Sequence, residues 1–191
     1  MSRWVNHEYE GAIAFLFILV SSLVPWSFST ASTDIAGQVT TWYWWFGHHL
    51  SVEASGQVSG FYPIIEAIQI QQGQAVYPGY VLWGISSVVF AAAIGLAFAL
   101  FVREEEVTAR MPIRFVAGGL LLASGIGFVS ANIWIMQNGI PGTYIPIGGA
   151  FQIVFGLFLV TNRYKSDSEF VNPNANTDAN TNTDAEPAAD S

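Results

Sequence analysis

Four stretches of this chain are long and apolar, and none contains an Asp, Glu, Lys or Arg through its centre. They cover residues 11–28, 79–102, 113–136 and 145–161. A helix needs about 20 mainly apolar residues to cross the roughly 30 Å hydrocarbon core of a bilayer. The pattern therefore predicts four transmembrane helices, of which the last is the shortest.

The basic residues indicate how these helices would be oriented. All six flank the apolar stretches: Arg3, Arg103, Arg110, Arg114, Arg163 and Lys165. Loops rich in Lys and Arg stay on the cytoplasmic side of a membrane. We therefore expect both termini to be cytoplasmic and loops 29–78 and 137–144 to be extracellular.

The composition agrees with a multi-pass protein of the cell membrane. Only 10% of the residues are charged and 52% are hydrophobic, whereas a soluble domain has roughly 25% charged residues. The fourteen acids against six bases give a formal charge of -8. An acidic surface with little lysine stays hydrated in concentrated salt, so we expect a halophilic archaeon as the source.

Several classes of function are disfavoured. The chain has no cysteine, which excludes disulfides and thiolate chemistry, and it has no basic patch for nucleic acid. His48 and His49 are adjacent and would face opposite ways in a strand, and His7 would lie across the membrane. Metal sites need converging ligands, so we expect no metal. We also expect no cofactor and no catalytic residue, and therefore a protein that is not an enzyme.

The first outer loop carries a signal for strands. Residues 38–46 are rich in β-branched and aromatic side chains and are followed by Gly47, a pattern typical of a strand. A second strand is expected near 50–54, and a short helix from Pro63. We expect a small extracellular β-hairpin and short helix that cap the bundle between its first two helices.

The aromatic residues of this loop form the candidate interaction surface. It comprises Trp42, Tyr43, Trp44, Trp45, Phe46, His48 and His49. Two interpretations remain open. Such rings gather at membrane interfaces and under protein caps, but exposed aromatic clusters also mark binding sites for a sugar, a quinone or another protein.

Small residues recur every four positions in two of the apolar stretches, as in helices that pack closely in membranes. The candidate packing residues are Ser87, Ala91, Gly95, Ala99, Gly119, Ala123, Gly127 and Ala131. We expect an intramolecular seam between the two helices, with a homodimer face or a substrate groove as alternatives. Asn132 and Gln152 are expected to form hydrogen bonds inside the bundle.

Residues 166–191 contain Ser, Asp, Asn, Thr, Ala and Pro with almost no apolar bulk. Such a segment cannot bury enough surface to offset the entropy of ordering. We therefore predict a transmembrane domain over residues 1–165 and a disordered acidic cytoplasmic tail over 166–191.

Three short motifs resemble those of a known group of proteins. They are the leader at residues 4–11 (WVNHEYEG), residues 24–27 (VPWS) and residues 103–105 (REE). Over most of residues 1–165 the chain resembles a family of uncharacterised haloarchaeal four-span membrane proteins. The resemblance implies four spans and a halophilic source, and it supplies no site residues. The plan is also similar to that of claudin-like proteins, although the paired loop cysteines of that family are missing.

The sequence thus predicts an all-α membrane protein, a four-transmembrane-helix bundle with a small outer cap. The expected role is non-enzymatic binding of another envelope or membrane protein through the outer aromatic loop. The helices are expected to contact the lipid bilayer. A small transporter or channel subunit is the alternative.

Overall fold

The computed structural model describes residues 10–33, 37–53, 58–110 and 112–161. Its helices are α1 (Glu10–Leu23), α2 (Ile64–Ile70), α3 (Tyr77–Arg110), α4 (Ile113–Asn138) and α5 (Ile147–Thr161). Its strands are β1 (Ser27–Thr33), β2 (Gly37–Trp44), β3 (Gly47–Glu53), β4 (Val58–Pro63) and β5 (Gly142–Ile145). The expected tail over 166–191 and most of the leader lie outside the described residues.

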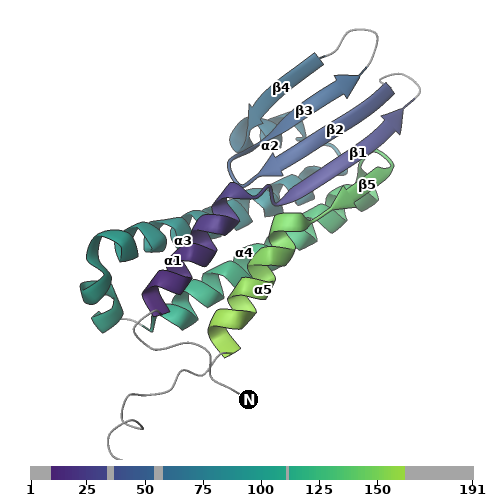
Figure 1. The fold of residues 1–191 in the computed structure, drawn as a ribbon. Coiled ribbons are helices and arrows are strands. Elements are labelled where there is room, and N and C mark those ends of the chain that lie inside the picture. The colour runs from purple at the N-terminus through teal and green to yellow at the C-terminus, as the bar shows by residue number, and fades with distance from the viewer. Residues whose placement is uncertain (1–9, 34–36, 54–57, 111, 162–191) are drawn as a thin grey trace, which may run out of the picture.

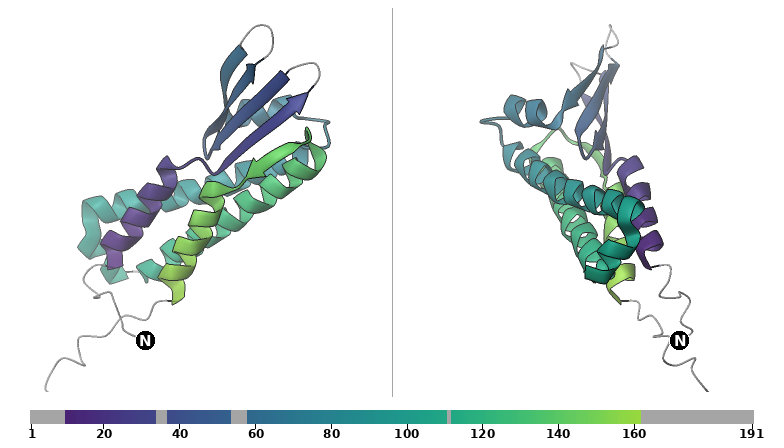
Figure 2. Two further views of the ribbon diagram at one scale, coloured as in Figure 1. Left: turned by 45° about the vertical axis from the view of Figure 1, so that its right-hand side comes forward. Right: turned by 90° about the vertical axis from the view of Figure 1, so that its left-hand side faces the viewer.

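The strands form one antiparallel sheet in the order β4-β3-β2-β1-β5. Figure 1 shows this sheet at one end of the helices, whereas the start of α1, the end of α5 and the connection between α3 and α4 lie at the other end. The two further views in Figure 2 show the same separation. The protein therefore has a helical part and a sheet part, joined where the ends of α1, α3, α4 and α5 meet the strands.

The predicted all-α, four-span bundle is wrong. Two of the described helices are long and apolar enough to cross a membrane, namely α4 and residues Tyr77–Arg103 of α3. α1 has 14 residues and α5 has 15, which is short of the about 20 needed for a crossing. The sheet also contains five strands, so it is more than a hairpin cap.

The prediction of a single helix over residues 11–28 is wrong, because this stretch contains both a helix and the start of a strand. α1 ends at Leu23, just before Pro25, since a proline disfavours helical geometry in the residue before it. From Ser27 the chain is extended, and Ser27–Thr33 pairs with both β2 and β5. The Ser and Thr residues that were expected to form a loop are therefore a central strand.

The long helices α3 and α4 form an antiparallel hairpin. α3 is bent at Arg103, whose backbone is non-helical (φ -144°, ψ 52°), and it continues to Arg110. An exposed ion pair of 3.3 Å joins Arg103 to Glu106 after the bend; such pairs add little stability. Pro112 precedes the first turn of α4, where a missing N–H costs nothing.

The closest helix contact is between α4 and α5, and glycines make it possible. A Cβ on Gly118 would lie 3.0 Å from the carbonyl oxygen of Gly156, and one on Gly125 would lie 2.9 Å from that of Gly149. Both pairs are seven residues apart along their helices, so they lie on one face. This glycine seam allows the two backbones to touch, as small residues do in membrane helix pairs.

Candidate functional site

The sheet has two faces of different character, because successive side chains of a strand point to opposite sides. One face covers a cavity above the ends of the helices, and we refer to it as the inner face. The opposite, outer face is directed away from this cavity. The strand register places each predicted residue of the aromatic run on one face or the other.

One row of side chains crosses the whole outer face. Cross-strand pairing aligns Ile145, Phe28, Trp42, His49 and Phe61 from β5 to β4. Trp42, Ile145 and Phe61 are 38%, 45% and 49% exposed. The rings of Phe28 and Trp42 are 4.4 Å apart. We call these five residues the aromatic row; it is uncharged apart from the ionisable His49.

The next row toward the tip of the sheet is made of hydroxyl residues. It comprises Thr143, Thr30, Thr40, Ser51 and Ser59. The hydroxyl of Ser59 lies 2.9 Å from Nε2 of His49, which links this row to the aromatic row. The outer face thus changes from apolar to polar with distance from the helices.

Trp45 and Phe46 form the loop between β2 and β3, since Trp44 pairs directly with Gly47. The Trp45 ring packs against Phe90 of α3 at 6.3 Å. Phe46 is 45% exposed and lies 5.8 Å from the Phe61 ring, so it extends the aromatic row. The aromatic run is therefore divided between burial and exposure.

A buried cluster of aromatic rings joins the sheet to the helices. Tyr43 and His48, paired on β2 and β3, contact Trp83 of α3 with ring distances of 5.6 and 5.9 Å. Trp26 contacts Tyr43 and also Phe128 of α4, at 5.3 and 5.2 Å. The Nε1–H of Trp83 donates to the carbonyl of Trp44 at 3.1 Å. These contacts fix the sheet on the bundle.

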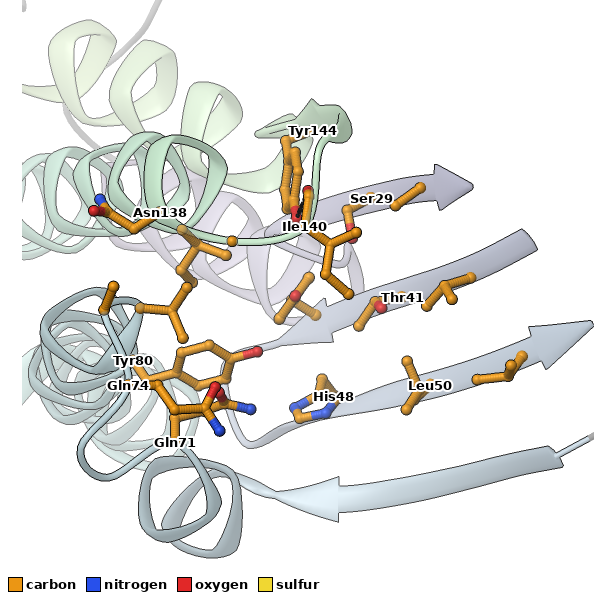
Figure 3. Close-up of a pocket in the computed structure, with 18 residues that line it drawn as sticks. Ser29, Thr41, His48, Leu50, Gln71, Gln74, Tyr80, Asn138, Ile140 and Tyr144 are labelled. Atoms are coloured by element: carbon orange, nitrogen blue, oxygen red, sulfur yellow. Dashed lines mark hydrogen bonds between the residues drawn. The ribbon is translucent and has the colours of Figure 1, made fainter. Parts of the chain in front are cut away.

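Beneath the inner face lies a cavity of about 520 Å³ (Figure 3). Strands β1, β2 and β3 form its roof. Its other walls come from the segment between α2 and α3, the start of α3, the end of α4 and the segment around β5. Its volume is within the roughly 300 to 1,000 Å³ of small-molecule sites.

The cavity becomes less polar with distance from the helices. The row nearest the helices contains Tyr43 and His48, joined from α3 by Tyr80. The middle row is mixed and contains Ser29, Thr41 and Leu50. The row nearest the tip of the sheet is apolar and contains Ala31, Val39 and Val52.

Three titratable side chains that line the cavity stay neutral at ordinary pH. Burial, and to a smaller extent the nearby His49, lowers the pKa of His48 from 6.5 to about 4. Burial, followed by the nearby Tyr80, raises the pKa of Tyr43 well above its ordinary value. Burial, followed by Tyr43, also raises the pKa of Tyr144. A low-dielectric site of this kind penalises any charged group.

No cluster of three or more His, Asp or Glu that could hold a metal occurs within the described parts of the chain. His48 lines the cavity, whereas His49 lies in the aromatic row on the other face. The two rings therefore do not converge, and the arrangement offers hydrogen bonding and apolar contact as its chemistry.

Only part of the expected small-residue seam lies where α3 and α4 come close. A Cβ added to Gly95 or Gly119 would have nothing within 4 Å. Ser87 and Ala91 line an open apolar groove between α2 and α3, Ala99 is half-buried and Ala123 is exposed. Two expected residues, Gly127 and Ala131, do meet α3: a Cβ on Gly127 would clash with Ser86, and a Cβ on Gly79 would lie 3.3 Å from the carbonyl oxygen of Ala131.

Each of the two buried amides in the helices pairs with a serine. Ser27 donates to Oδ1 of Asn132 at 2.8 Å, and Ser124 donates to Oε1 of Gln152 at 2.9 Å. All four residues are buried. These bonds join β1 to α4 and α4 to α5, which agrees with a structural role.

Sequence reasoning missed most of the cavity. Ser29, Thr41, Tyr80 and Tyr144 come from four different elements, and no local pattern joins them. The available signal was the alternation in β2 and β3, which places Thr41 with Tyr43 and His48 with Leu50. The other walls depend on the long-range pairing of β1 with β5.

Comparison with curated proteins finds no match to this chain. The model of a family of unknown function, DUF7549, matches residues 3–164. The chain therefore belongs to the DUF7549 family.

Proposed function

We propose that this protein is anchored in a membrane by α3 and α4 and holds its sheet outside the bilayer, where the aromatic row recognises another membrane or envelope protein. The proposed role is non-enzymatic. The observation that carries it is the exposed aromatic row across the sheet.

The exposed apolar surface of the long helices supports the membrane anchor. The most apolar 18-residue windows of α3 and α4 are only 33% and 39% buried, whereas a core helix of a soluble protein is mostly buried. Large apolar side chains exposed along these helices include Ile85, Val88, Phe98, Phe101, Ile126 and Ile133. Hydrocarbon is the solvent that suits such a surface. The shorter helices α1 and α5 would lie against them in the same apolar layer.

The charge distribution supports the orientation. Arg103 and Arg114 flank the connection between α3 and α4, at the end far from the sheet (Figure 1). The sequence between Arg3 and Arg103, which includes β1 to β4, has no Lys or Arg. By the positive-inside rule, the connection is cytoplasmic and the sheet is extracellular.

The aromatic row supports recognition of a partner because it exposes ring surface on the outer face of the sheet. Trp42 and Phe61 lie on the face opposite the cavity and are 38% and 49% exposed. Aromatic side chains are enriched at the centres of protein interfaces. The neighbouring hydroxyl row would provide the polar rim that such interfaces have.

The alternative role as a transporter or channel subunit receives no support from the polar residues of the helices. A wet path needs polar groups that are free to face water. Asn132 and Gln152 each bond to a buried serine instead.

The acidic composition, with one lysine in the chain, supports a haloarchaeal source, so experiments belong in concentrated salt.

Site-specific photo-crosslinking tests the proposed recognition. Replacing Trp42 with p-benzoyl-phenylalanine and irradiating native membranes should give a discrete adduct with another protein. The matched control places the same group at Gln72, which is exposed between α2 and α3 and should give no such adduct. Adducts with lipid alone at position 42 would show that the aromatic row is an interfacial belt and would contradict the proposal.

A further inference from the structure

The cavity beneath the sheet has a shape and lining that the proposed recognition by the outer face does not use. It is lined by eighteen residues, ten of which are labelled in Figure 3, and none of them is Asp, Glu, Lys or Arg. A charged ligand would therefore be desolvated without a compensating partner. The lining suits a neutral ligand.

The polar end of the cavity has hydrogen-bonding groups on two sides. Tyr43 and His48 come from the roof, and the hydroxyl of Tyr80 points from α3 toward His48 (Figure 3). Gln71 and Gln74 lie at the same end. Hydroxyl and amide groups can each donate and accept hydrogen bonds. A hydroxyl or carbonyl group placed here would find partners of both kinds.

His48 provides the second, independent observation. Its side chain is only 7% exposed, and its buried Nδ1 has no hydrogen-bond partner within the protein. Buried polar atoms are paired in the large majority of cases, and an exception calls for an explanation. Tyr62 stacks on the ring at 5.3 Å and Trp83 packs at 5.9 Å, so the ring is held in place without using that nitrogen.

We infer that the cavity binds a small, uncharged amphipathic molecule, with a hydroxyl or carbonyl group beside Tyr43, His48 and Tyr80 and an apolar part along Val39 and Val52. The three inner rows follow this order, from polar through mixed to apolar. A ligand with its polar group at one end matches that gradient.

The exposed residues of the lining show where the ligand enters. Gln74 and Ala75 are exposed between α2 and α3, Asn138 is exposed at the end of α4, and Ile140 is exposed between α4 and β5. The mouth therefore lies between the segment before α3 and the end of α4. A 3.1 Å hydrogen bond from Trp134 of α4 to the carbonyl of Ala75 holds these two sides together. The site is independent of the outer face, so either proposal can fail without the other.

Three naphthalene compounds provide a direct test with the full chain in nanodiscs at high salt. 2-Naphthol carries a neutral hydroxyl, naphthalene lacks a polar group and 2-naphthoate is charged. The chain has three histidines, so histidine-selective isotope labelling gives a simple NMR spectrum in which loss of a signal in His48→Gln identifies His48. We expect 2-naphthol to shift the His48 signal saturably and to leave that of His49, on the opposite face, unchanged.

Selectivity follows from the lining. 2-Naphthoate should bind at least about tenfold more weakly because the cavity has no cation, and naphthalene similarly because it leaves the polar end unpaired. His48→Phe keeps an aromatic ring but loses the nitrogen, and should weaken 2-naphthol binding roughly five- to tenfold. The fluorescence of 2-naphthol, corrected with empty nanodiscs, measures its own affinity, and its displacement by naphthalene or 2-naphthoate measures theirs.

A matched pair of variants locates the binding. Leu50→Trp fills the middle row of the cavity and should abolish the response, whereas Ser51→Trp, one residue later on the outer face, should retain it. Equal binding of 2-naphthoate by the wild-type protein would overturn the inference. So would an unchanged response in Leu50→Trp, an equal shift of His49, or no saturable shift at millimolar 2-naphthol.

Discussion

His48 combines three properties in one side chain. It is buried at the junction of the sheet and α3, its Nδ1 lacks a partner within the protein, and burial lowers its pKa to about 4. Its ring neighbours are the aromatic residues Tyr43, Tyr62, Tyr80 and Trp83. The folded protein therefore holds His48 in its neutral form.

This neutral histidine makes stability depend on pH. Below pH about 6.5 the unfolded chain binds a proton at His48 that the folded protein does not bind until pH about 4. The free energy of unfolding should therefore fall by about 2 to 3 kcal/mol as the pH drops through this window. Thermal unfolding of wild type and His48→Gln in detergent, from pH 7.5 to 4.5, measures it. The variant should lose less stability across the window; parallel curves would show that His48 does not contribute.

At the scale of elements, the sequence predicts the long helices well and the sheet poorly. The expected helices over 79–102 and 113–136 correspond to α3 and α4, because sustained hydrophobicity is a local property. The strand near 38–46 corresponds to β2, and the alternation of β3, which pairs with β2, separates His48 from His49. β5 has only four residues and exists through pairing with β1, more than a hundred residues earlier. Local patterns cannot reveal such a partner.

The helix contacts illustrate the same limit. Small residues at every fourth position predicted a seam between α3 and α4. A Cβ at Gly95 or Gly119 would meet nothing within 4 Å, whereas Gly127 and Ala131 do lie against α3. A further close contact, of Gly118 and Gly125 with Gly156 and Gly149 of α5, was not predicted. Glycine is common in both sets, so spacing alone does not show which face meets a neighbour.

Two substitutions on α4 test the glycine seam. Gly125→Ala would place a Cβ 2.9 Å from the Gly149 carbonyl oxygen and 3.0 Å from the Gln152 Cβ, and should cost about 1 to 3 kcal/mol. Gly119→Ala meets open space and should be neutral or stabilising by up to about 1 kcal/mol. Thermal unfolding of both variants in the same detergent gives the comparison. Equal losses at the two positions would argue against the α4–α5 contact.

At the scale of the whole molecule, the helical part and the sheet part expose different kinds of surface. The helices expose apolar side chains along their length, while the sheet exposes an aromatic row and a hydroxyl row and covers a neutral cavity. The exposed charges Arg103 and Glu106 lie at the far end of α3. This division gives the proposed topology, with the recognition surface and the cavity on the same side of the membrane.

Cysteine labelling in intact cells tests that topology most directly, because the chain has no cysteine of its own. A membrane-impermeant maleimide should label Ser51→Cys, on the outer face of the sheet, in intact cells. Glu106→Cys, beyond the bend in α3, should react only after the cells are permeabilised. Labelling of Glu106→Cys but not Ser51→Cys in intact cells, or recovery of the protein in the soluble fraction, would contradict a membrane protein whose sheet lies outside.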